Sequence, residues 1–299
     1  MSSALAALAL AVGLELALGE PPARAHPVAW FGRAVERVDR EWGRPRVVGA
    51  CVALLLPALA AGVAAGTVAL AALVHPFVGI LVAGTVLFVS TSLRMLLDVA
   101  REVIAESERD LPRARESVRA LAGRSPEELS AGEIRSATVE SSAENLADGL
   151  VAPLGAFASL APLSLALAAG GAAWVKAVNT LDSMLGYPEK PHGTASARLD
   201  DGVMYLSARA SAVLLALAAR KPMAPLRARR WARAPPSPNS GWPMATLAVL
   251  LGVRLEKPDV YILNRSRELP TVAEARRGVR IVALAGALAY LLSGVLAWF

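Results

Sequence analysis

The chain has 299 residues, of which 55% are hydrophobic and 19% are charged, with a mean hydropathy of +0.46. This composition excludes an ordinary soluble domain and predicts an integral membrane protein. The net charge of +6 does not indicate a nucleic-acid partner, because the basic residues lie beside apolar runs, where cytoplasmic anchors are typical. The single cysteine, Cys51, excludes an internal disulfide, and three isolated histidines argue against a zinc site.

Apolar runs in the first third of the chain predict three membrane spans. Residues 1–19 carry one charge and predict the first span. Residues 20–46 are rich in arginine and predict an amphipathic helical loop on the cytoplasmic surface. Residues 47–93 contain no Asp, Glu, Lys or Arg and would be about 70 Å long as one helix. They therefore predict a hairpin of two spans that meet at His75-Pro76.

The next segment, residues 94–148, is polar and predicts three cytoplasmic helices. We expect the first over about 94–107. We expect the second over 110–123, because Pro112 suits its first turn. The third begins at Ser130.

Residues 149–219 predict embedded helices that carry polar motifs. Prolines and the pair Gly170-Gly171 interrupt residues 149–175, which therefore form either a broken span or a re-entrant pair of short helices. We prefer the re-entrant pair, because it keeps every polar motif on the cytoplasmic face. Residues 220–280 are basic and predict a cytoplasmic segment, and residues 281–299 predict the last span.

The pattern as a whole predicts an all-α, polytopic integral membrane protein. We expect one membrane domain over residues 1–299, with about four to six membrane-embedded helical segments and a helical cytoplasmic insertion. No internal repeat is visible, which gives little support to a transporter built from inverted halves.

The most informative stretch begins at Ser130, which forms a capping box with Glu133 and predicts a helix start. Glu140, Glu144 and Asp148 follow at steps of four residues and share one helix face, where like charges cost stability. Few large apolar residues accompany them, so packing does not explain this acidic stripe. The stripe predicts a bound cation such as Mg²⁺. The alternative is a solvated acidic face.

Six motifs occur in order along nearly the whole chain. They are GEPPARAHPVAWFGR (19–33), RSPEEL (124–129), ATVESSAENLADGLVAPL (137–154), VKAVNTLDSMLGY (175–187), GTASARLDD (193–201) and PNSGWPMA (238–245). Together they resemble the adenosylcobinamide-phosphate synthase family, the cobalamin-biosynthesis membrane proteins called CbiB or CobD. This chain departs from the family pattern at four positions. Glu20 stands in place of Asp, and Met204 and Ser207 stand in place of Asn and Pro. Val249 stands where a Gly is common.

The resemblance implies ATP-dependent amide synthesis by a multi-pass protein of the cell membrane, with its active site on the cytoplasmic face. Adenosylcobyric acid would supply the carboxylate, and aminopropanol phosphate or a related aminoalcohol phosphate would supply the amine. The expected partners are this corrinoid, the aminoalcohol phosphate, ATP with Mg²⁺, membrane lipid and other cobalamin-assembly enzymes, but no nucleic acid. Since no P-loop motif is present, ATP would bind in another way.

Such chemistry requires cations along the triphosphate, carboxylates that hold Mg²⁺, and a base for the amine. The candidate catalytic residues are Glu140, Glu144, Asp182, Asp200 and Asp201. The candidate Mg²⁺ ligands are Glu140, Glu144, Asp148, Asp182 and Asp200. The candidate substrate-binding and ATP-binding residues are His26, Asn145, Lys176, Asn179, Ser183, Arg198, Arg209 and Asn239. His26 is a candidate base, and a histidine that packs a turn is the alternative.

Two other classes of function are alternatives. A transporter would place acids within its spans, whereas the acids here cluster in polar segments. A non-catalytic membrane sensor of the same superfamily would lack part of the NTLDS and LDD motifs, which are both present. For the enzyme we expect Glu144, Asp182 and one of Asp200 or Asp201 within about 10 Å of one another, beside a polar cleft wide enough for a corrin. We also expect Glu140→Ala and Glu144→Ala each to abolish activity and leave the fold intact.

Overall fold

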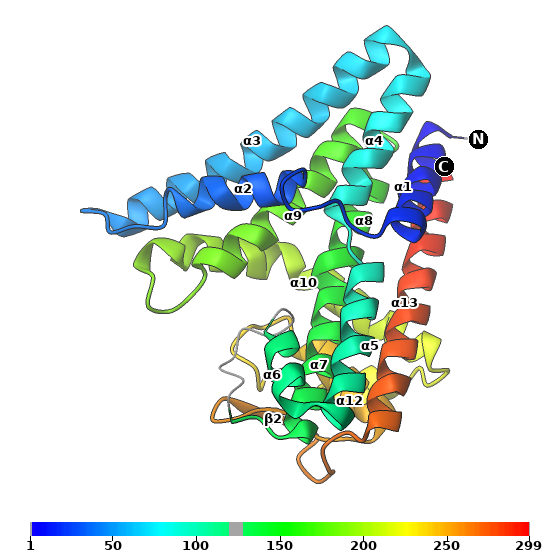
Figure 1. The fold of residues 1–299 in the computed structure, drawn as a ribbon. Helices are drawn as coiled ribbons and strands as arrows, with labels where there is room; N and C mark the ends of the chain where they lie inside the picture. The colour runs from blue at the N-terminus through cyan, green and yellow to red at the C-terminus, as the bar shows by residue number, and fades with distance from the viewer. Residues whose placement is uncertain (1, 120–127, 299) are drawn as a thin grey trace. The chain divides into compact units, whose positions relative to one another are not determined.

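The computed structural model describes residues 2–119 and 128–298, which are mostly helical (Figure 1). The chain divides into two compact units, each assembled from separate stretches of sequence. The first unit comprises residues 2–92, 148–204 and 290–298, and the second comprises residues 93–119, 128–147 and 205–289. The expectation of one membrane domain over the whole chain stays a prediction.

The first unit is built around α3 and α9, which lie against each other (Figure 1). Its helices are α1 (Ser3–Leu18), α2 (Pro27–Glu36), α3 (Pro45–Val74), α4 (Pro76–Ser90), α8 (Ala152–Leu160), α9 (Leu165–Leu185) and the 3₁₀ turn η2 (Pro191–Gly193). Three elements contribute residues to both units, namely the π-helix η1 (Ala147–Val151), α10 (Thr194–Ala218) and α13 (Val272–Trp298).

α3 and α4 form the hairpin that was expected for residues 47–93 (Figure 1). His75 separates them, because its Nδ1 accepts a hydrogen bond from the amide of Phe77 at 3.1 Å and thereby caps α4. Leu55 and Leu59 of α3 are 66% and 63% exposed. Large apolar side chains exposed along a helix are expected where the helix faces lipid.

Four helical segments in the described residues are long and apolar enough to cross a membrane. They are Pro45–Val74, Pro76–Arg109, Pro191–Ala218 and Val272–Trp298. The chain is therefore an all-α, polytopic membrane protein, as the composition predicted. α1 is apolar but has only 16 residues, so its expected passage through the membrane stays a prediction.

Residues 149–175 comprise the end of η1, all of α8 and about the first half of α9, with a turn between α8 and α9. Ser164 ends the turn by capping α9. The expected interruption at Gly170-Gly171 is wrong, because both glycines lie inside α9. They allow close packing instead. A Cβ at Gly170 would lie 3.1 Å from the carbonyl oxygen of Ala61 in α3, so the missing side chain lets the two helices approach.

The second unit is built around α7 (Ala131–Leu146). Its other elements are α5 (Arg94–Arg109), α6 (Leu111–Val118), α11 (Ala224–Ala228), α12 (Gly241–Leu251), β1 (Leu255–Lys257) and β2 (Tyr261–Leu263). The predicted capping box is confirmed. Ser130 Oγ accepts a hydrogen bond from the amide of Glu133 at 3.3 Å, and the Glu133 carboxylate accepts one from the amide of Ser130 at 2.7 Å.

α7 is more deeply buried than its few large apolar residues suggested. Ser136, Ala137, Thr138, Ser142 and Ala143 are each fully buried. Small side chains let neighbouring backbones approach closely, so α7 packs through Ala, Ser and Thr as well as through its apolar residues.

The polar helices agree with their predicted starts. α5 covers the helix expected over about 94–107, and Asp110 caps α6 as expected. α6 ends at Val118. The end expected at Gly123, and residues 124–127 of the RSPEEL motif, lie outside the described residues.

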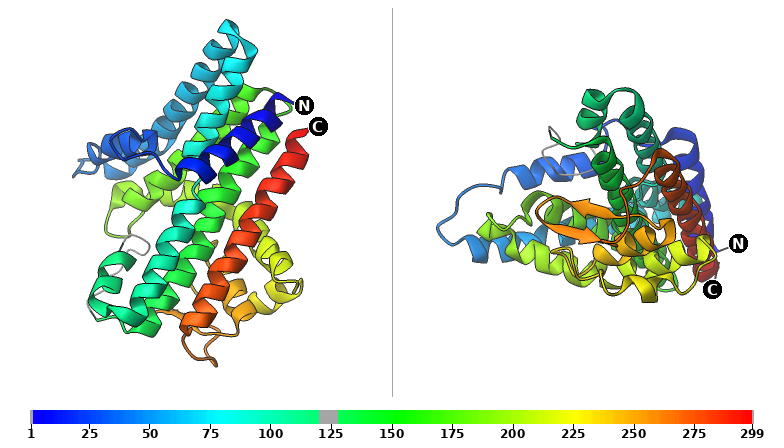
Figure 2. Two further views of the ribbon diagram at one scale, coloured as in Figure 1. Left: turned by 45° about the vertical axis from the view of Figure 1, so that its right-hand side comes forward. Right: turned by 90° about the horizontal axis from the view of Figure 1, so that it is seen from below.

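β1 and β2 form a short antiparallel hairpin that the sequence analysis did not predict (Figure 2). Leu255 pairs with Leu263, and the turn contains Asp259 with a left-handed φ of 60°. β1 packs directly against α7. The hairpin thus brings residues from the C-terminal part of the chain onto the helix that carries the acidic stripe.

Candidate functional site

Lys176 lies where three of the sequence motifs meet in the first unit. It stands in the middle of α9 and interacts electrostatically with Glu20 and Asp148. Glu20 follows Gly19, whose φ of 72° ends α1 in a sharp turn, and Asp148 lies in the π-helix η1. π-helical turns are frequent at functional sites. Lys176 places a positive charge near Asp148, and the Mg²⁺ ion expected at the acidic stripe stays a prediction.

His26 completes this arrangement, and we refer to Glu20, His26, Asp148 and Lys176 as the Lys176 cluster. His26 caps α2, because its Nδ1 accepts a hydrogen bond from the amide of Val28 at 3.2 Å. In the neutral ring Nε2 therefore carries the proton, and it lies 4.0 Å from the Glu20 carboxylate. Burial lowers the pKa of His26, an effect that Glu20 opposes and Lys176 reinforces.

The geometry of His26 favours the turn-packing alternative over the role of a base. Its Nδ1 lone pair is already occupied by a backbone amide, and its Nε2, which carries the proton in the neutral ring, lies 4.0 Å from the Glu20 carboxylate. Neither nitrogen is thus available to accept a proton from a substrate. The carboxylate of Glu20, which the sequence analysis did not select, has oxygen atoms that can accept a hydrogen bond from a substrate. Its position in the GEPP motif was the signal that could have identified it.

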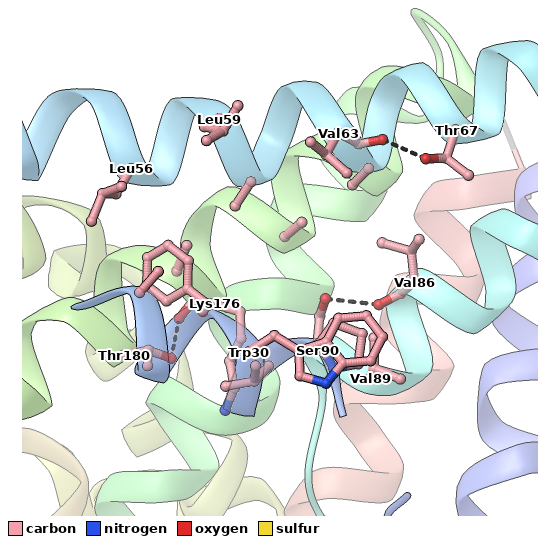
Figure 3. A pocket seen from close by; sticks show the side chains of 18 residues that line it. Trp30, Leu56, Leu59, Val63, Thr67, Val86, Val89, Ser90, Lys176 and Thr180 are labelled. Carbon is pink, nitrogen blue, oxygen red and sulfur yellow. Dashed lines mark hydrogen bonds between the residues drawn. The ribbon is translucent and has the colours of Figure 1, made fainter. Parts of the chain in front are cut away.

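The Lys176 side chain lines a pocket of about 480 Å³ in the first unit (Figure 3). α2, α3, α4 and α9 supply its walls, which are mainly apolar and include Trp30, Leu59 and Val63. Lys176 is the single charged residue among the described residues of the lining. Burial lowers the pKa of Lys176, an effect that the charges of Glu20 and Asp148 oppose. α9, which carries Lys176, is not one of the four candidate membrane spans. The polar cleft expected for a corrin stays a prediction.

Asp182 and Asp201 bring two negative charges together, one near the end of α9 and one in α10. Burial and, to a smaller extent, repulsion from Asp201 raise the pKa of Asp182 to about 6. Asp182 Oδ1 is buried and has no hydrogen-bond partner among the described residues. Gly186 leaves room for it, since a Cβ there would lie 1.9 Å from this oxygen. A hard divalent cation such as Mg²⁺ suits the pair, because its charge would offset both the cost of burying a carboxylate and the repulsion between the two carboxylates.

Other residues of the NTLDS and ARLDD motifs lie on the same two helices within the first unit. Ser183 donates a hydrogen bond from Oγ to the carbonyl of Thr180 at 2.9 Å. Asn179 lies on α9, and Arg198 is exposed on α10. Asp200 is only 9% exposed.

Met204, which stands where the resemblance led us to expect Asn, is 1% exposed. It packs in an apolar cluster with Ala152 and Val175. Its role here is therefore packing, and the position offers no polar group to a ligand.

A further polar cluster in the first unit was missed by the sequence analysis. Asp39 accepts a hydrogen bond from Lys190 Nζ at 2.6 Å and lies 3.0 Å from His192 Nε2. The hydrogen bond from Lys190 is the main cause that lowers the pKa of Asp39. The cluster joins the segment that follows α2 to the turn before α10. The one available signal was the position of His192 next to the GTASARLDD motif.

In the second unit, Glu140 is 2% exposed, so a solvated acidic face is wrong for this residue. Its Oε1 accepts a hydrogen bond from Ser136 Oγ at 2.7 Å, and its Oε2 accepts one from the Tyr261 hydroxyl at 2.5 Å. The Ser136 hydroxyl also accepts a hydrogen bond from the amide of Glu256 in β1 at 2.8 Å. Glu140 thus fastens the β hairpin to α7. Tyr261 is 121 residues away in sequence, and no pattern pointed to it.

Two predicted substrate-binding residues of the second unit contact each other. Arg209 donates hydrogen bonds to Asn239 Oδ1 and to the carbonyl of Tyr205, both at 2.8 Å. Its guanidinium also stacks on the Tyr205 ring at 3.6 Å from the centroid. These contacts explain how an apolar helix accommodates an arginine. They also give the PNSGWPMA motif, which contains Asn239, a role in anchoring α10.

The predicted site residues therefore fall into separate groups. The first unit brings Asp148 to Lys176 and Asp182 to Asp201. The second unit contains Glu140, Glu144 and Asn145, whose Nδ2 donates to the carbonyl of Ser141 at 3.0 Å. Within residues 2–119 and 128–298, no three acidic, histidine or cysteine side chains are grouped to hold a metal ion. The Mg²⁺ site, and the meeting of Glu144 with Asp182, stay predictions.

Comparisons with known proteins agree with the order of the motifs. Residues 8–291 match the family described as CobD/Cbib protein. The chain is 36% identical to the probable cobalamin biosynthesis protein CobD of Methanothrix thermoacetophila, over 97% of this chain and 95% of that protein. It is 36% identical to the cobalamin biosynthesis protein CobD of Rhodobacter capsulatus, over 92% of each chain. It is 35% identical to the cobalamin biosynthesis protein CbiB of Salmonella typhi, over 90% of this chain and 86% of that protein. No solved structure matches the chain significantly. The chain belongs to the CobD/CbiB family of cobalamin-biosynthesis proteins.

Proposed function

We propose that this protein is an ATP-dependent ligase that joins adenosylcobyric acid to aminopropanol phosphate, or to a related aminoalcohol phosphate, through an amide bond. The observation that carries the proposal is the Lys176 cluster. Residues from three motifs that lie far apart in the sequence surround one partly buried lysine there, beside a pocket of about 480 Å³. An arrangement of this kind is typical of a ligand site, because a buried cation with two carboxylate neighbours has a steep structural cost.

The proposed reaction has two steps. The corrinoid carboxylate first attacks the γ-phosphorus of ATP, which forms an acyl phosphate and releases ADP. The amine then attacks the acyl carbon, the bond from that carbon to the phosphate oxygen breaks, and inorganic phosphate leaves. One proton must be taken from the attacking nitrogen.

The residues of the first unit supply the groups that these steps need. The Lys176 ammonium would bind anionic oxygen atoms of the substrate or of the leaving phosphate. Glu20 would accept the proton of the amine, and His26 would position Glu20 through its Nε2 proton. Asp182 and Asp201 would hold the Mg²⁺ ion that accompanies ATP and neutralises its phosphates. The proposal places this chemistry on the cytoplasmic side of the cell membrane, where ATP is available.

The test is amide formation by the purified protein in detergent, with ATP, Mg²⁺, adenosylcobyric acid and aminopropanol phosphate. Mass spectrometry measures the amide, and ADP release measures ATP use. We expect Lys176→Met to lower kcat/KM by about a hundredfold or more, because the substitution keeps the apolar stem and removes the charge. Lys190→Met, which removes a lysine of the same unit outside the cluster, should stay within about threefold of the parent.

Two results would contradict the proposal. One is a parent protein that consumes no ATP when both substrates are present. The other is a Lys176→Met variant with the activity of the parent.

A further inference from the structure

Four arginines of the second unit surround a polar pocket that the proposed amide synthesis does not use. The pocket has a volume of about 550 Å³, within the range of small-ligand sites. Its lining includes Arg227, Arg229, Arg230 and Arg267, together with Trp231 and Asn264. We refer to it as the arginine pocket. The described residues of its lining include no Asp or Glu.

The four guanidinium groups have no counter-ion within the described residues, since none of them forms an ion pair with a described carboxylate. Like charges that gather around one cavity raise its potential and attract anions. The ordinary explanation is a set of solvated arginines that mark the cytoplasmic side of the membrane. That explanation accounts for the number of arginines but not for their convergence on a single hollow.

The arginine pocket is held in shape by contacts that do not involve the guanidinium groups. Asn264 is 7% exposed, and its Nδ2 donates to the carbonyl of Val253 at 2.9 Å beyond the end of α12. The backbone carbonyl of Asn264 accepts a hydrogen bond from the amide of Arg267 at 3.1 Å, which fixes the backbone of Arg267 at the pocket. Arg230 stacks on Trp231 at 3.8 Å from the ring centroid. Stacking orients a guanidinium and leaves its in-plane N–H donors available.

Capping of α12 does not explain the four arginines either. Cations are favoured at a helix C-terminus, where carbonyl groups lack partners. At α12 these carbonyls already have other donors. Arg277 donates to the carbonyls of Leu250 and Leu251, and Asn264 donates to that of Ala248. The arginines of the pocket therefore keep their donors for another acceptor.

We propose that the arginine pocket is a binding site for a phosphate-bearing anion. Guanidinium groups match phosphate oxygens in pairs, and four of them supply the charge that a polyphosphate or a phosphodiester head group requires. The phosphate could belong to a soluble molecule or to an anionic lipid, and the experiment distinguishes these sources. The site rests on its own geometry and does not depend on the amide synthesis proposed above.

The test compares two double variants of the full-length protein. Arg227→Gln with Arg230→Gln removes two charges from the arginine pocket. Lys221→Gln with Arg233→Gln removes two charges from exposed positions of the same basic segment that do not line it. Calorimetry without Mg²⁺ measures the affinity of purified protein for inorganic triphosphate. Melting temperatures in nanodiscs of phosphatidylcholine, with or without phosphatidylglycerol, measure the response to lipid.

We expect the parent to bind triphosphate, to be stabilised by phosphatidylglycerol, or both. The pocket variant should lose affinity by about tenfold or more, and the control variant by less than about twofold, because contacts between charged groups dominate such sites. A response to lipid alone would assign the pocket to a head group, and a response to triphosphate alone would assign it to a soluble phosphate. Equal losses in the two variants, or no response of the parent to either probe, would overturn the proposal. Unliganded melting temperatures of both variants show whether the fold is retained.

Discussion

The carboxylate of Glu140 is buried in the second unit and accepts hydrogen bonds from Ser136 and Tyr261. Removal of a buried acceptor leaves its donors unsatisfied and costs more than the loss of an average hydrogen bond. The structure therefore argues against the expectation that Glu140→Ala leaves the fold unaffected. Any loss of activity in that variant has to be separated from a loss of stability.

We predict that Glu140→Ala lowers the free energy of unfolding by about 1–3 kcal/mol, because the Tyr261 hydroxyl loses its acceptor. Tyr261→Phe should lower the free energy of unfolding by a smaller amount, because it removes the hydroxyl itself and so leaves no buried hydroxyl without an acceptor. Melting temperatures in detergent provide the measurement, with Glu144→Ala on the same helix as the control. A Glu140→Ala variant as stable as the parent would show that this hydrogen-bond network contributes little.

Asp182 makes the stability of the first unit depend on pH. Its pKa is raised to about 6 in the fold, above the ordinary value of 3.8, so the folded state binds the proton more tightly than the unfolded state does. Its contribution to stability is therefore present at low pH and is lost as the pH rises from about 4 through 6. For a partly exposed carboxyl we expect this loss to be about 1–2 kcal/mol.

We predict that Asp182→Asn removes this loss, because an amide does not ionise. In the presence of EDTA, the variant should therefore gain stability relative to the parent between pH 5 and pH 7.5. Addition of Mg²⁺ at pH 7.5 should then stabilise the parent more than the variant, if the pair of Asp182 and Asp201 binds the ion. The same difference in melting temperature at both pH values would contradict the assigned burial of Asp182.

Sequence reasoning identified some residues and missed others for physical reasons. Ser130 was predictable because a capping box acts within four residues of chain. The role of His26 was open until the structure placed its Nδ1 on the Val28 amide. Tyr261 could not be found, since its contact with Glu140 depends on tertiary packing across 121 residues.

At the scale of helices, backbone contacts explain why replacing some glycines lowers stability. Gly49 of α3 faces η2, where an added Cβ would lie 2.0 Å from the carbonyl oxygen of His192. Gly66 stands on the same helix and would meet nothing within 4 Å. The two positions thus form a matched pair within one element.

We predict that Gly49→Ala lowers the free energy of unfolding by about 1–3 kcal/mol, because η2 must move away from α3. Gly66→Ala should be neutral or stabilising by up to about 1 kcal/mol, because alanine favours a helix. Melting temperatures of the two variants test the pair. Equal effects at both positions would show that η2 does not pack on α3 as described.

The helices themselves were predicted better than their packing. The hairpin of α3 and α4 followed from an uncharged run that is too long for one span, and His75-Pro76 marked its turn. The glycines of α9 were misinterpreted because the sequence shows that a side chain is missing but not whether a neighbouring helix needs the space. The β hairpin was missed because its two strands have only three residues each.

For the whole molecule, the orientation of the motifs in the membrane is the main prediction that follows from the sequence. The re-entrant interpretation of residues 149–175 puts Glu144 and Asp182 on the same, cytoplasmic side. The broken-span alternative puts Asp182 outside. The turn between α8 and α9 is compatible with a re-entrant pair.

We predict that cysteines at both positions are accessible from the cytoplasm. Cys51→Ser removes the single native thiol, and Glu144→Cys or Asp182→Cys is then introduced alone. A membrane-impermeant maleimide should label both variants in inside-out vesicles and neither in intact cells. Labelling of the Asp182→Cys variant in intact cells would refute the re-entrant interpretation and the hypothesis of a single site.

The tie between the two ends of the first unit sets the order of events during synthesis. Tyr290 of α13 donates a hydrogen bond to Glu15 of α1, and Ser2 bonds to the carbonyl of Ala297, so the first and last helices lie side by side there (Figure 2). Glu15 and Tyr290 are 275 residues apart. At about 5–20 residues per second, a ribosome needs roughly 14–55 seconds to make that stretch. During that time the Glu15 carboxylate cannot form its hydrogen bond with Tyr290. The contact between α1 and α13 therefore forms only after α13 has left the ribosome.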